Sequence, residues 1–126
     1  MTPIAYVFIF AAFCATNAWA QTAPVDIRRG ADVFAEQCAE CHSVREGKQK
    51  KGPSLFGISG RKAATQPGFE YSEALRNAGW TWDQERLAFY LSQPAKKANP
   101  GGKMKFDGVS DKADLANLCG YLATLH

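Results

Sequence analysis

The sequence predicts an all-α protein, and three observations lead to this fold class. Apolar or small residues recur at helical spacing in several short stretches. No stretch alternates apolar and polar residues in the way that half-buried strands do. Glycine and proline interrupt the rest of the chain, so long loops must join the helices. With 126 residues of ordinary composition, we expect one folded domain of several short helices and long loops.

The first helix is predicted to follow Asp26, which is a good N-cap residue. Ile27, Gly30, Phe34 and Cys38 then recur at helical spacing and form one apolar or small face. A glycine inside a helix costs about 1 kcal/mol relative to alanine. We therefore expect Gly30 to lie in close contact with another helix. The chain from 43 to 70 is rich in basic residues, glycine and proline, and is predicted to be mainly loop.

Three further helices are predicted along the second half. The first covers 71–77 and ends near Gly79, and the second covers 82–91 and stops before Pro94. The last opens at Ser110 and runs to the C-terminal end, with an apolar face of Leu115, Leu118, Cys119, Leu122 and Leu125. A few short helices cannot bury enough apolar surface by themselves. We therefore expect another group to fill the centre of the domain.

The N-terminal segment is predicted to lie outside the fold. Residues 4–15 are almost uniformly apolar, and Ala18-Trp19-Ala20 has the small-x-small form of a signal-peptidase site. We expect a signal peptide over 1–20, a mature domain over 21–126 and export to the periplasm. A retained membrane anchor is the alternative, because no Lys or Arg precedes the apolar run. Cys14 would be lost on cleavage.

The chemistry-bearing motif is Cys38-Ala39-Glu40-Cys41-His42. This C-x-x-C-H pattern is typical of covalent haem attachment. Two thiols at this spacing can reach the two vinyl groups on one haem edge, and the next residue, His42, then offers a nitrogen ligand to the iron. A thioredoxin-like redox pair would need an α/β pattern, and a zinc site would need a second Cys/His pair at ligand spacing. Only Cys119 and His126 remain for such a pair. The motif therefore favours one covalently bound haem c.

A sixth iron ligand is expected far along the chain. Met104 is the only methionine after Met1, and it lies in a loop bounded by glycine and proline. A lone methionine is more often a packing residue than a ligand, but this setting favours Met104 as the ligand. His126 is the weaker candidate because it ends the chain.

The net charge is only +3, which does not indicate nucleic-acid binding. Lysines nevertheless gather in the two loops that bracket the expected iron ligands: Lys48, Lys50, Lys51, Lys96, Lys97, Lys103 and Lys105. We expect them to make the surface near the haem edge positive, and to steer it toward acidic patches on redox partners.

The sequence resembles the class I cytochromes c, of the mitochondrial type and its bacterial counterparts, from Gly30 to about Leu125. The resemblance rests on positions that occur in the same order: Gly30 and Phe34, Cys38-x-x-Cys41-His42, Gly52-Pro53, Gly60-Arg61-Lys62, Pro67-Gly68-Phe69-x-Tyr71, Trp82, Tyr90-Leu91, Pro94, Pro100-Gly101 and Lys103-Met104-x-Phe106. It implies the small cytochrome c fold, in which the first and last helices cross where Gly30 and Phe34 meet Leu118 and Tyr121. The chain departs from the family pattern at Cys119, which we expect to be a small buried apolar residue.

The resemblance also implies roles around the haem. His42 and Met104 would be the axial ligands, with the Pro53 carbonyl accepting the His42 ring N–H. Tyr71, Trp82 and Arg61 would hold the propionates. Asn77 and Tyr90 would form a polar network on the Met104 side. Trp80 has no matched role and is taken as packing.

The implied function is one-electron transport, because an iron with six ligands has no vacant site for a substrate. We expect a monomer, not an enzyme, that serves respiratory, photosynthetic or dehydrogenase partners, whether membrane-bound or soluble. Two alternatives remain open from the residues. One is a haem enzyme or gas-binding protein in which Met104 is not bound. The other is an electron-entry subunit tied to one dehydrogenase.

Overall fold

The computed structural model describes residues 22–126, and the predicted signal peptide, its anchor alternative and Cys14 lie outside this range. Five helices form in it: α1 (Ile27–Gln37), α2 (Glu73–Arg76), α3 (Gln84–Leu91), α4 (Ala95–Ala98) and α5 (Lys112–Ala123). The described part of the chain contains no strand, and its one β-type pairing is an isolated bridge between Lys62 and Thr81. Within 22–126, no helix has the length and apolar character to cross a membrane. The all-α prediction is confirmed.

Helix α1 begins directly after Asp26, as predicted, whereas α3 and α5 begin two residues after the predicted starts at 82 and Ser110, because aspartate side chains cap them. The Asp26 carboxylate accepts from the amides of Arg28 and Arg29 at the start of α1. Asp83 and Asp111 act in the same way for α3 and α5. Each cap satisfies backbone donors that have no partner inside the helix, which is worth about 1 kcal/mol.

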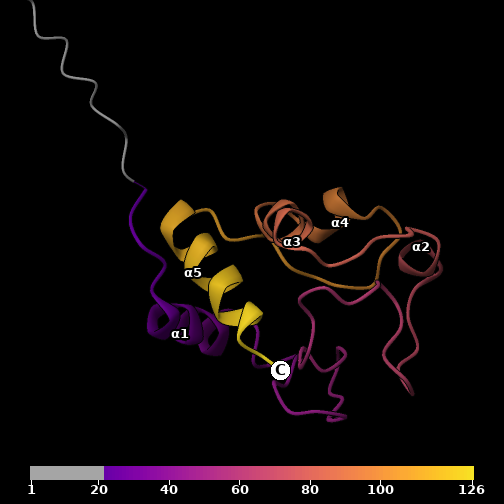
Figure 1. Cartoon of the computed structure of the whole chain (residues 1–126). Coiled ribbons are helices and arrows are strands. Elements are labelled where there is room, and N and C mark those ends of the chain that lie inside the picture. The colour runs from indigo at the N-terminus through magenta and orange to yellow at the C-terminus, as the bar shows by residue number, and fades with distance from the viewer. Residues whose placement is uncertain (1–21) are drawn as a thin grey trace, which may run out of the picture.

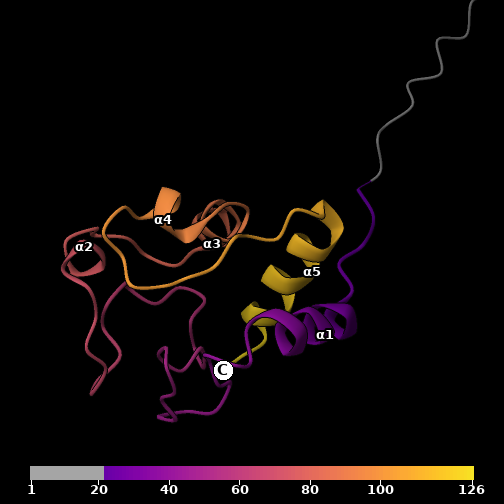
Figure 2. The ribbon, with the colours of Figure 1, turned by 180° about the vertical axis from the view of Figure 1, so that it is seen from behind.

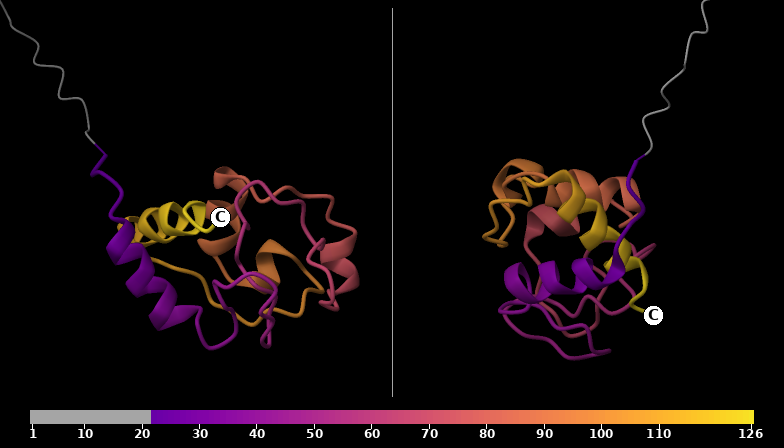
Figure 3. Two further views of the ribbon diagram at one scale, coloured as in Figure 1. Left: turned by 60° about the horizontal axis from the view of Figure 1, so that its bottom comes forward. Right: turned by 90° about the vertical axis from the view of Figure 1, so that its left-hand side faces the viewer.

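Helices α1 and α5 lie side by side at one end of the molecule (Figures 1 and 3). A Cβ at Gly30 would stand only 2.7 Å from the Tyr121 Cβ, so glycine permits this close approach. The rings of Phe34 and Tyr121 pack beside it in a tilted arrangement, with centroids 5.9 Å apart. The predicted crossing is confirmed. Val33 and Leu118 from these helices have no exposed surface and form the centre of the core.

Helices α2 and α4 lie at the other end, and α3 lies between the two ends, where it packs on both α5 and α4, as the view from behind also shows (Figure 2). α2 is shorter than the predicted 71–77 helix, because Ser72 caps it and it contains one turn. α4 was not predicted. It is a single turn of Ala-Lys-Lys-Ala after Pro94, and its amides at Lys97 and Ala98 donate to the Pro94 carbonyl.

The long loop between α1 and α2 folds under the molecule and is tied both to its own start after α1 and to the C-terminal end of the chain. The Gly52 amide donates to the Cys41 carbonyl at 2.7 Å, and the Gly57 amide donates to the Leu125 carbonyl at 2.5 Å. Fully buried Ser54 donates from its hydroxyl to the Arg45 carbonyl at 2.5 Å. These bonds give a segment without regular structure a defined path beside α5.

Candidate functional site

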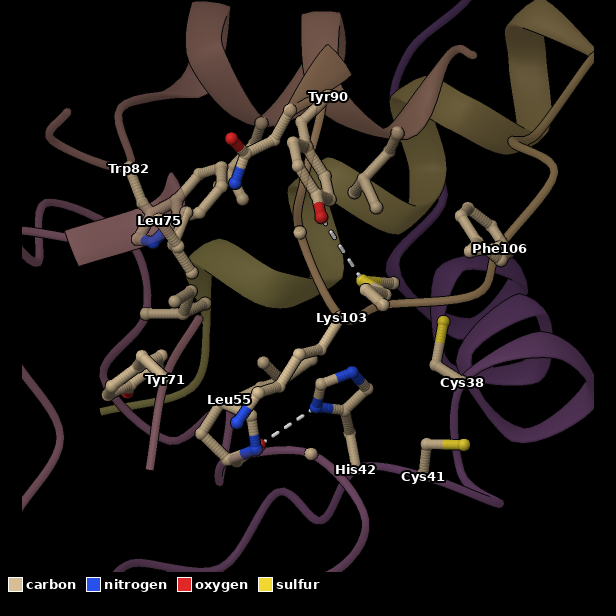
Figure 4. Close-up of a pocket in the computed structure, with 18 of the residues that line it drawn as sticks. Cys38, Cys41, His42, Leu55, Tyr71, Leu75, Trp82, Tyr90, Lys103 and Phe106 are labelled. Atoms are coloured by element: carbon tan, nitrogen blue, oxygen red, sulfur yellow. Dashed lines mark hydrogen bonds between the residues drawn. The ribbon is translucent and has the colours of Figure 1, made fainter. Parts of the chain in front are cut away.

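A cavity of about 350 Å³ lies between the two ends of the molecule. Its lining comes from α1, α2, α3, α5 and the loops between them, and most of it is apolar, including Leu55, Ile58, Leu75, Leu87, Leu91, Phe106, Leu118 and Leu122. Figure 4 shows Cys38 and Cys41 on the α1 side of this space and Tyr71, Leu75 and Trp82 on the opposite side. The helices thus enclose an apolar space at the centre of the domain, as the shortage of apolar surface predicts.

The two thiols reach the cavity through a turn that follows α1. The Cys38 amide donates to the Phe34 carbonyl at 2.8 Å, and the amides of Cys41 and His42 donate back to the Cys38 carbonyl at 3.1 and 2.9 Å. This turn places both sulfurs and the His42 ring against one wall. Burial raises the pKa of the Cys38 thiol to about 11, with a smaller contribution from neighbouring Cys41. Before a haem is attached, the Cys38 thiol is therefore neutral at physiological pH.

The His42 ring is held in place through one of its two nitrogens, Nδ1. Its Nδ1–H donates to the Pro53 carbonyl across 2.8 Å, which leaves the Nε2 lone pair free. Burial lowers the pKa of His42, so the ring is neutral, as a metal ligand must be. A Cβ on Gly52 would stand 2.7 Å from Nδ1, so only glycine leaves room for the ring here.

Met104 lines the cavity from the loop after α4. The Tyr90 hydroxyl, on α3, donates to its sulfur at 3.5 Å (Figure 4, upper dashed line). Tyr90 is buried, and the loss of water contact raises the pKa of its hydroxyl. The hydroxyl therefore stays protonated at neutral pH, and its hydrogen bond holds the thioether in position.

The cavity wall opposite the thiols presents hydrogen-bond donors. Arg61 is half-buried, and its guanidinium donates to the carbonyls of Phe56 and Ser54 and to the Gln66 side chain at 2.7–3.1 Å. None of these acceptors carries a charge, so its positive charge is not neutralised there. Tyr71 and Trp82 are buried beside it, and the Tyr71 hydroxyl accepts from the Gln66 amide at 3.2 Å. The structure therefore brings together all three residues that the resemblance assigns to the propionates.

The structure corrects the expectation for Asn77. This residue caps the C-terminal end of α2, is exposed and does not line the cavity. Leu75, two residues earlier, lines the cavity instead. Residues two apart on a helix point about 200° apart, so the face that buries Leu75 turns Asn77 to solvent. The polar network predicted for Asn77 and Tyr90 is therefore limited to the contact of Tyr90 with Met104.

Three other residues lie outside the cavity lining. His126 is exposed at the C-terminal end. Cys119 is buried on α5, where burial raises the pKa of its thiol, in agreement with the predicted role as a small apolar residue. Trp80 is half-buried and packs edge-on against Trp82, with the Arg86 guanidinium 4.7 Å from its ring centroid. A residue that sequence reasoning missed is Asn99, a buried asparagine that does line the cavity.

The donor set fits a covalently attached haem. The cavity combines two thiols on one wall, a neutral imidazole with a free nitrogen, a thioether and cationic or neutral donors on the far wall, within an apolar lining. Within residues 22–126, no group of three or more His, Cys, Asp or Glu side chains could hold a metal ion. These features define the class of small c-type haem proteins.

Comparisons with known proteins agree with this class. The family model described as cytochrome c matches residues 27–126. Cytochrome c of Euglena viridis is 40% identical over 100 residues, which cover 79% of this chain and 97% of that protein. Cytochrome c2 iso-2 of Magnetospirillum fulvum is 47% identical over 88 residues, which cover 70% and 91%. The solved structure of cytochrome cH from Methylobacterium extorquens superposes with a TM-score of 0.72 at 39% identity, covering 79% of this chain and 98% of that one.

The chain belongs to the cytochrome c family. Its fold is the small cytochrome c fold, and it carries one covalent haem c at the C-x-x-C-H motif. Members of the family are electron carriers and not enzymes, and this chain is a monohaem electron carrier that exchanges electrons with redox partner proteins.

Proposed function

We propose that this electron carrier holds its haem iron between His42 and Met104, works in the periplasm after cleavage behind Ala20, and docks on acidic partner surfaces through the lysines at the haem edge. The observation that carries the proposal is the convergence of Cys38, Cys41, His42 and Met104 on one apolar cavity. When bound, the haem supplies an iron that accepts and releases one electron.

The residues around the cavity explain why such an iron would serve transport. His42 and Met104 would occupy both axial positions, so no vacant site would remain for a substrate. A neutral thioether favours Fe(II), and an apolar pocket disfavours the added charge of Fe(III), so both raise the potential. The bonds from Pro53 to His42 and from Tyr90 to Met104 hold the two ligating groups in place, which limits reorganisation when the charge changes.

The ligand assignment is tested by the visible spectrum. Oxidised wild-type protein should show low-spin iron and the weak far-red absorption of a sulfur–iron bond. Met104→Ala should lose this band, lower the potential and bind carbon monoxide. Leu75→Ala is a matched control, because it also removes a side chain from the cavity wall but takes away no ligating atom. A wild-type protein that lacks the band and binds carbon monoxide readily would favour the haem-enzyme alternative.

Covalent attachment and export have separate tests. Acid–acetone extraction should leave the colour with the polypeptide, whereas a noncovalent haem would pass into the solvent. Replacing both Cys38 and Cys41 by alanine should leave little folded protein, because the core would lose its largest apolar group. Mass spectrometry of periplasmic protein should give Gln21 as the first residue plus one haem. An intact Met1 in the membrane fraction would support the retained anchor instead.

The docking surface is supported by the positions of the lysines. Lys51, Lys103 and Lys105 line the mouth of the cavity and are exposed. Lys51 pairs with Glu40 at 2.8 Å, and Lys103 donates to the Glu70 carbonyl at 3.2 Å. Lys105 makes neither an ion pair nor a hydrogen bond with the described residues, so its full charge faces outward. Contacts of this kind raise association rates and weaken with salt, as suits a carrier that must leave its partner quickly.

A further inference from the structure

We propose that Asn99 is a further haem-binding residue, and that its side-chain amide donates a hydrogen bond to a propionate carboxylate of the haem. The inference rests on the binding of a haem in the cavity and on the location of Asn99 in its wall. It adds a polar contact from the α4 end of the domain to those of Arg61, Tyr71 and Trp82.

The first argument is that the Asn99 amide lacks a partner. The residue is 6% exposed and lines the cavity. Its backbone is fully engaged, since its N–H donates to the Ala95 carbonyl at 2.8 Å and its carbonyl accepts from Gly102 at 3.0 Å. Its side-chain amide makes no hydrogen bond with any residue in 22–126, and its polar atoms keep accessible surface, since no buried side-chain N or O atom of the described residues lacks a partner. A group that fills the cavity would cover this amide, so that group is expected to supply its partner.

The second argument is that the local chain is built to hold this side chain in place. Asn99 ends α4, directly before a Pro-Gly-Gly turn. A Cβ at Gly102 would stand 3.3 Å from the Asn99 Nδ2 and 3.0 Å from its carbonyl oxygen, so a larger residue there would press on the amide. Gly101 in turn lies against α2, where its Cβ would be 3.4 Å from that of Ala74. Asn99 therefore belongs to the same wall as α2.

The third argument identifies the part of the haem that this wall meets. Thioether bonds to Cys38 and Cys41 would hold the vinyl edge of the haem on the α1 side. The wall of Tyr71, Leu75 and Trp82 lies across the cavity from the two thiols (Figure 4), so this wall would meet the opposite edge, which carries the propionates. Ionised carboxylates buried there need donors.

The hydrogen-bond donors on this wall support the assignment of Asn99 to a propionate. The Arg61 guanidinium is matched only by neutral acceptors, and the Trp82 side chain lines the cavity and makes no hydrogen bond within the described residues. On the α2 side, Leu75 contributes no polar atom, whereas buried Ser72 contributes a hydroxyl that accepts from the Leu75 amide at 3.2 Å. The Asn99 amide therefore adds a further donor to this side of the wall.

The test uses nitrogen-labelled, reduced holoprotein, in which low-spin iron is diamagnetic. The Asn99 side-chain protons should show nuclear Overhauser contacts to the propionate methylene protons of the haem. One of them should exchange with solvent at least about tenfold more slowly than those of Asn77, the factor that a hydrogen bond worth about 1.4 kcal/mol supplies. Asn77 is the matched control because it is an exposed asparagine outside the cavity.

Two variants extend the test. Asn99→Leu should shift the propionate bending band in the resonance Raman spectrum and lower the reduction potential, because a carboxylate without its donor stabilises Fe(III) more strongly. Asn99→Asp, which keeps the shape, should lower the potential further because it adds a negative charge. Asn77→Leu should change neither readout. If Asn99→Leu does not fold, the Overhauser contacts and Asn99→Asp still decide the question.

The assignment is overturned if the Asn99 protons show no contact to the propionates. It is equally overturned if Asn99→Leu or Asn99→Asp keeps the wild-type Raman band and potential. These failures differ from a failure of the ligand assignment, which would appear in the wild-type protein as a missing far-red band and carbon monoxide binding.

Discussion

Replacing Gly30 by alanine tests the crossing of α1 and α5, on which the position of the C-x-x-C-H turn depends. The new methyl group would stand 2.7 Å from both the Tyr121 Cβ and the Asn117 carbonyl carbon. Carbon atoms pack best at about 3.5–4.0 Å, so the helices must separate by about 1 Å. The neighbours belong to the backbone and to a Cβ of α5, so no side-chain rotation can relieve the contact.

Three contributions, two unfavourable and one favourable, set the expected change in the free energy of unfolding. Overpacking of this kind costs about 1–3 kcal/mol, and loosening the Phe34–Tyr121 ring contact costs about 1 kcal/mol. Alanine returns about 1 kcal/mol of helix propensity. We therefore expect Gly30→Ala to lower the free energy of unfolding by about 2 kcal/mol. In guanidinium unfolding of oxidised holoprotein, followed by circular dichroism, the midpoint should fall by about 0.5–1 M.

Gly120→Ala in α5 is the matched control. Its new methyl would meet the Val25 side chain, which is 50% exposed and can move aside. The propensity gain should then dominate, and we expect no loss or a gain of up to about 1 kcal/mol. The reasoning is refuted if Gly30→Ala is as stable as wild type, or if the two variants change stability in the same direction by the same amount.

Three further changes have expected outcomes. Tyr90→Phe removes the hydrogen-bond donor that lies 3.5 Å from the Met104 sulfur. The thioether would then donate more charge to the iron, so the reduction potential in a redox titration should fall, by no more than about 1 kcal/mol. A higher potential would contradict this contact. The Arg29 hydrogen bond lowers the pKa of Asp114, so this pair contributes stability above the unfolded pKa of about 3.9 and loses it as pH falls through the folded pKa. Asp114→Asn should therefore flatten the acid part of a stability-against-pH curve, and an unchanged curve would contradict the linkage. Lys105→Glu should slow association with an acidic redox partner in stopped-flow measurements at low salt, and the difference in rate should shrink with added salt. The far-red band should stay intact. Equal association rates at all salt concentrations would count against docking at this edge.

Local features of the chain could be predicted from the sequence because their causes are local. Asp26 marks the start of α1, since a cap acts on amides two or three residues ahead. The C-x-x-C-H motif identifies covalent haem because five consecutive residues supply both thiols and the imidazole. Gly30 indicates a close helix contact because a glycine inside a helix needs a compensating reason.

The all-α class, the haem motif and the candidate ligand Met104 could therefore be predicted from the residues alone. Which of the two asparagines faces the cavity depends on the tertiary packing. Asn77 and Asn99 both lie near the ends of short helices, and the sequence does not distinguish them. The single turn of α2 points Leu75 inward and Asn77 outward, whereas the turn after α4, packed on α2 through Gly101, buries Asn99 in the wall. The direction of a side chain at the end of a one-turn helix depends on how that turn packs against distant residues, and this information is absent from local spacing.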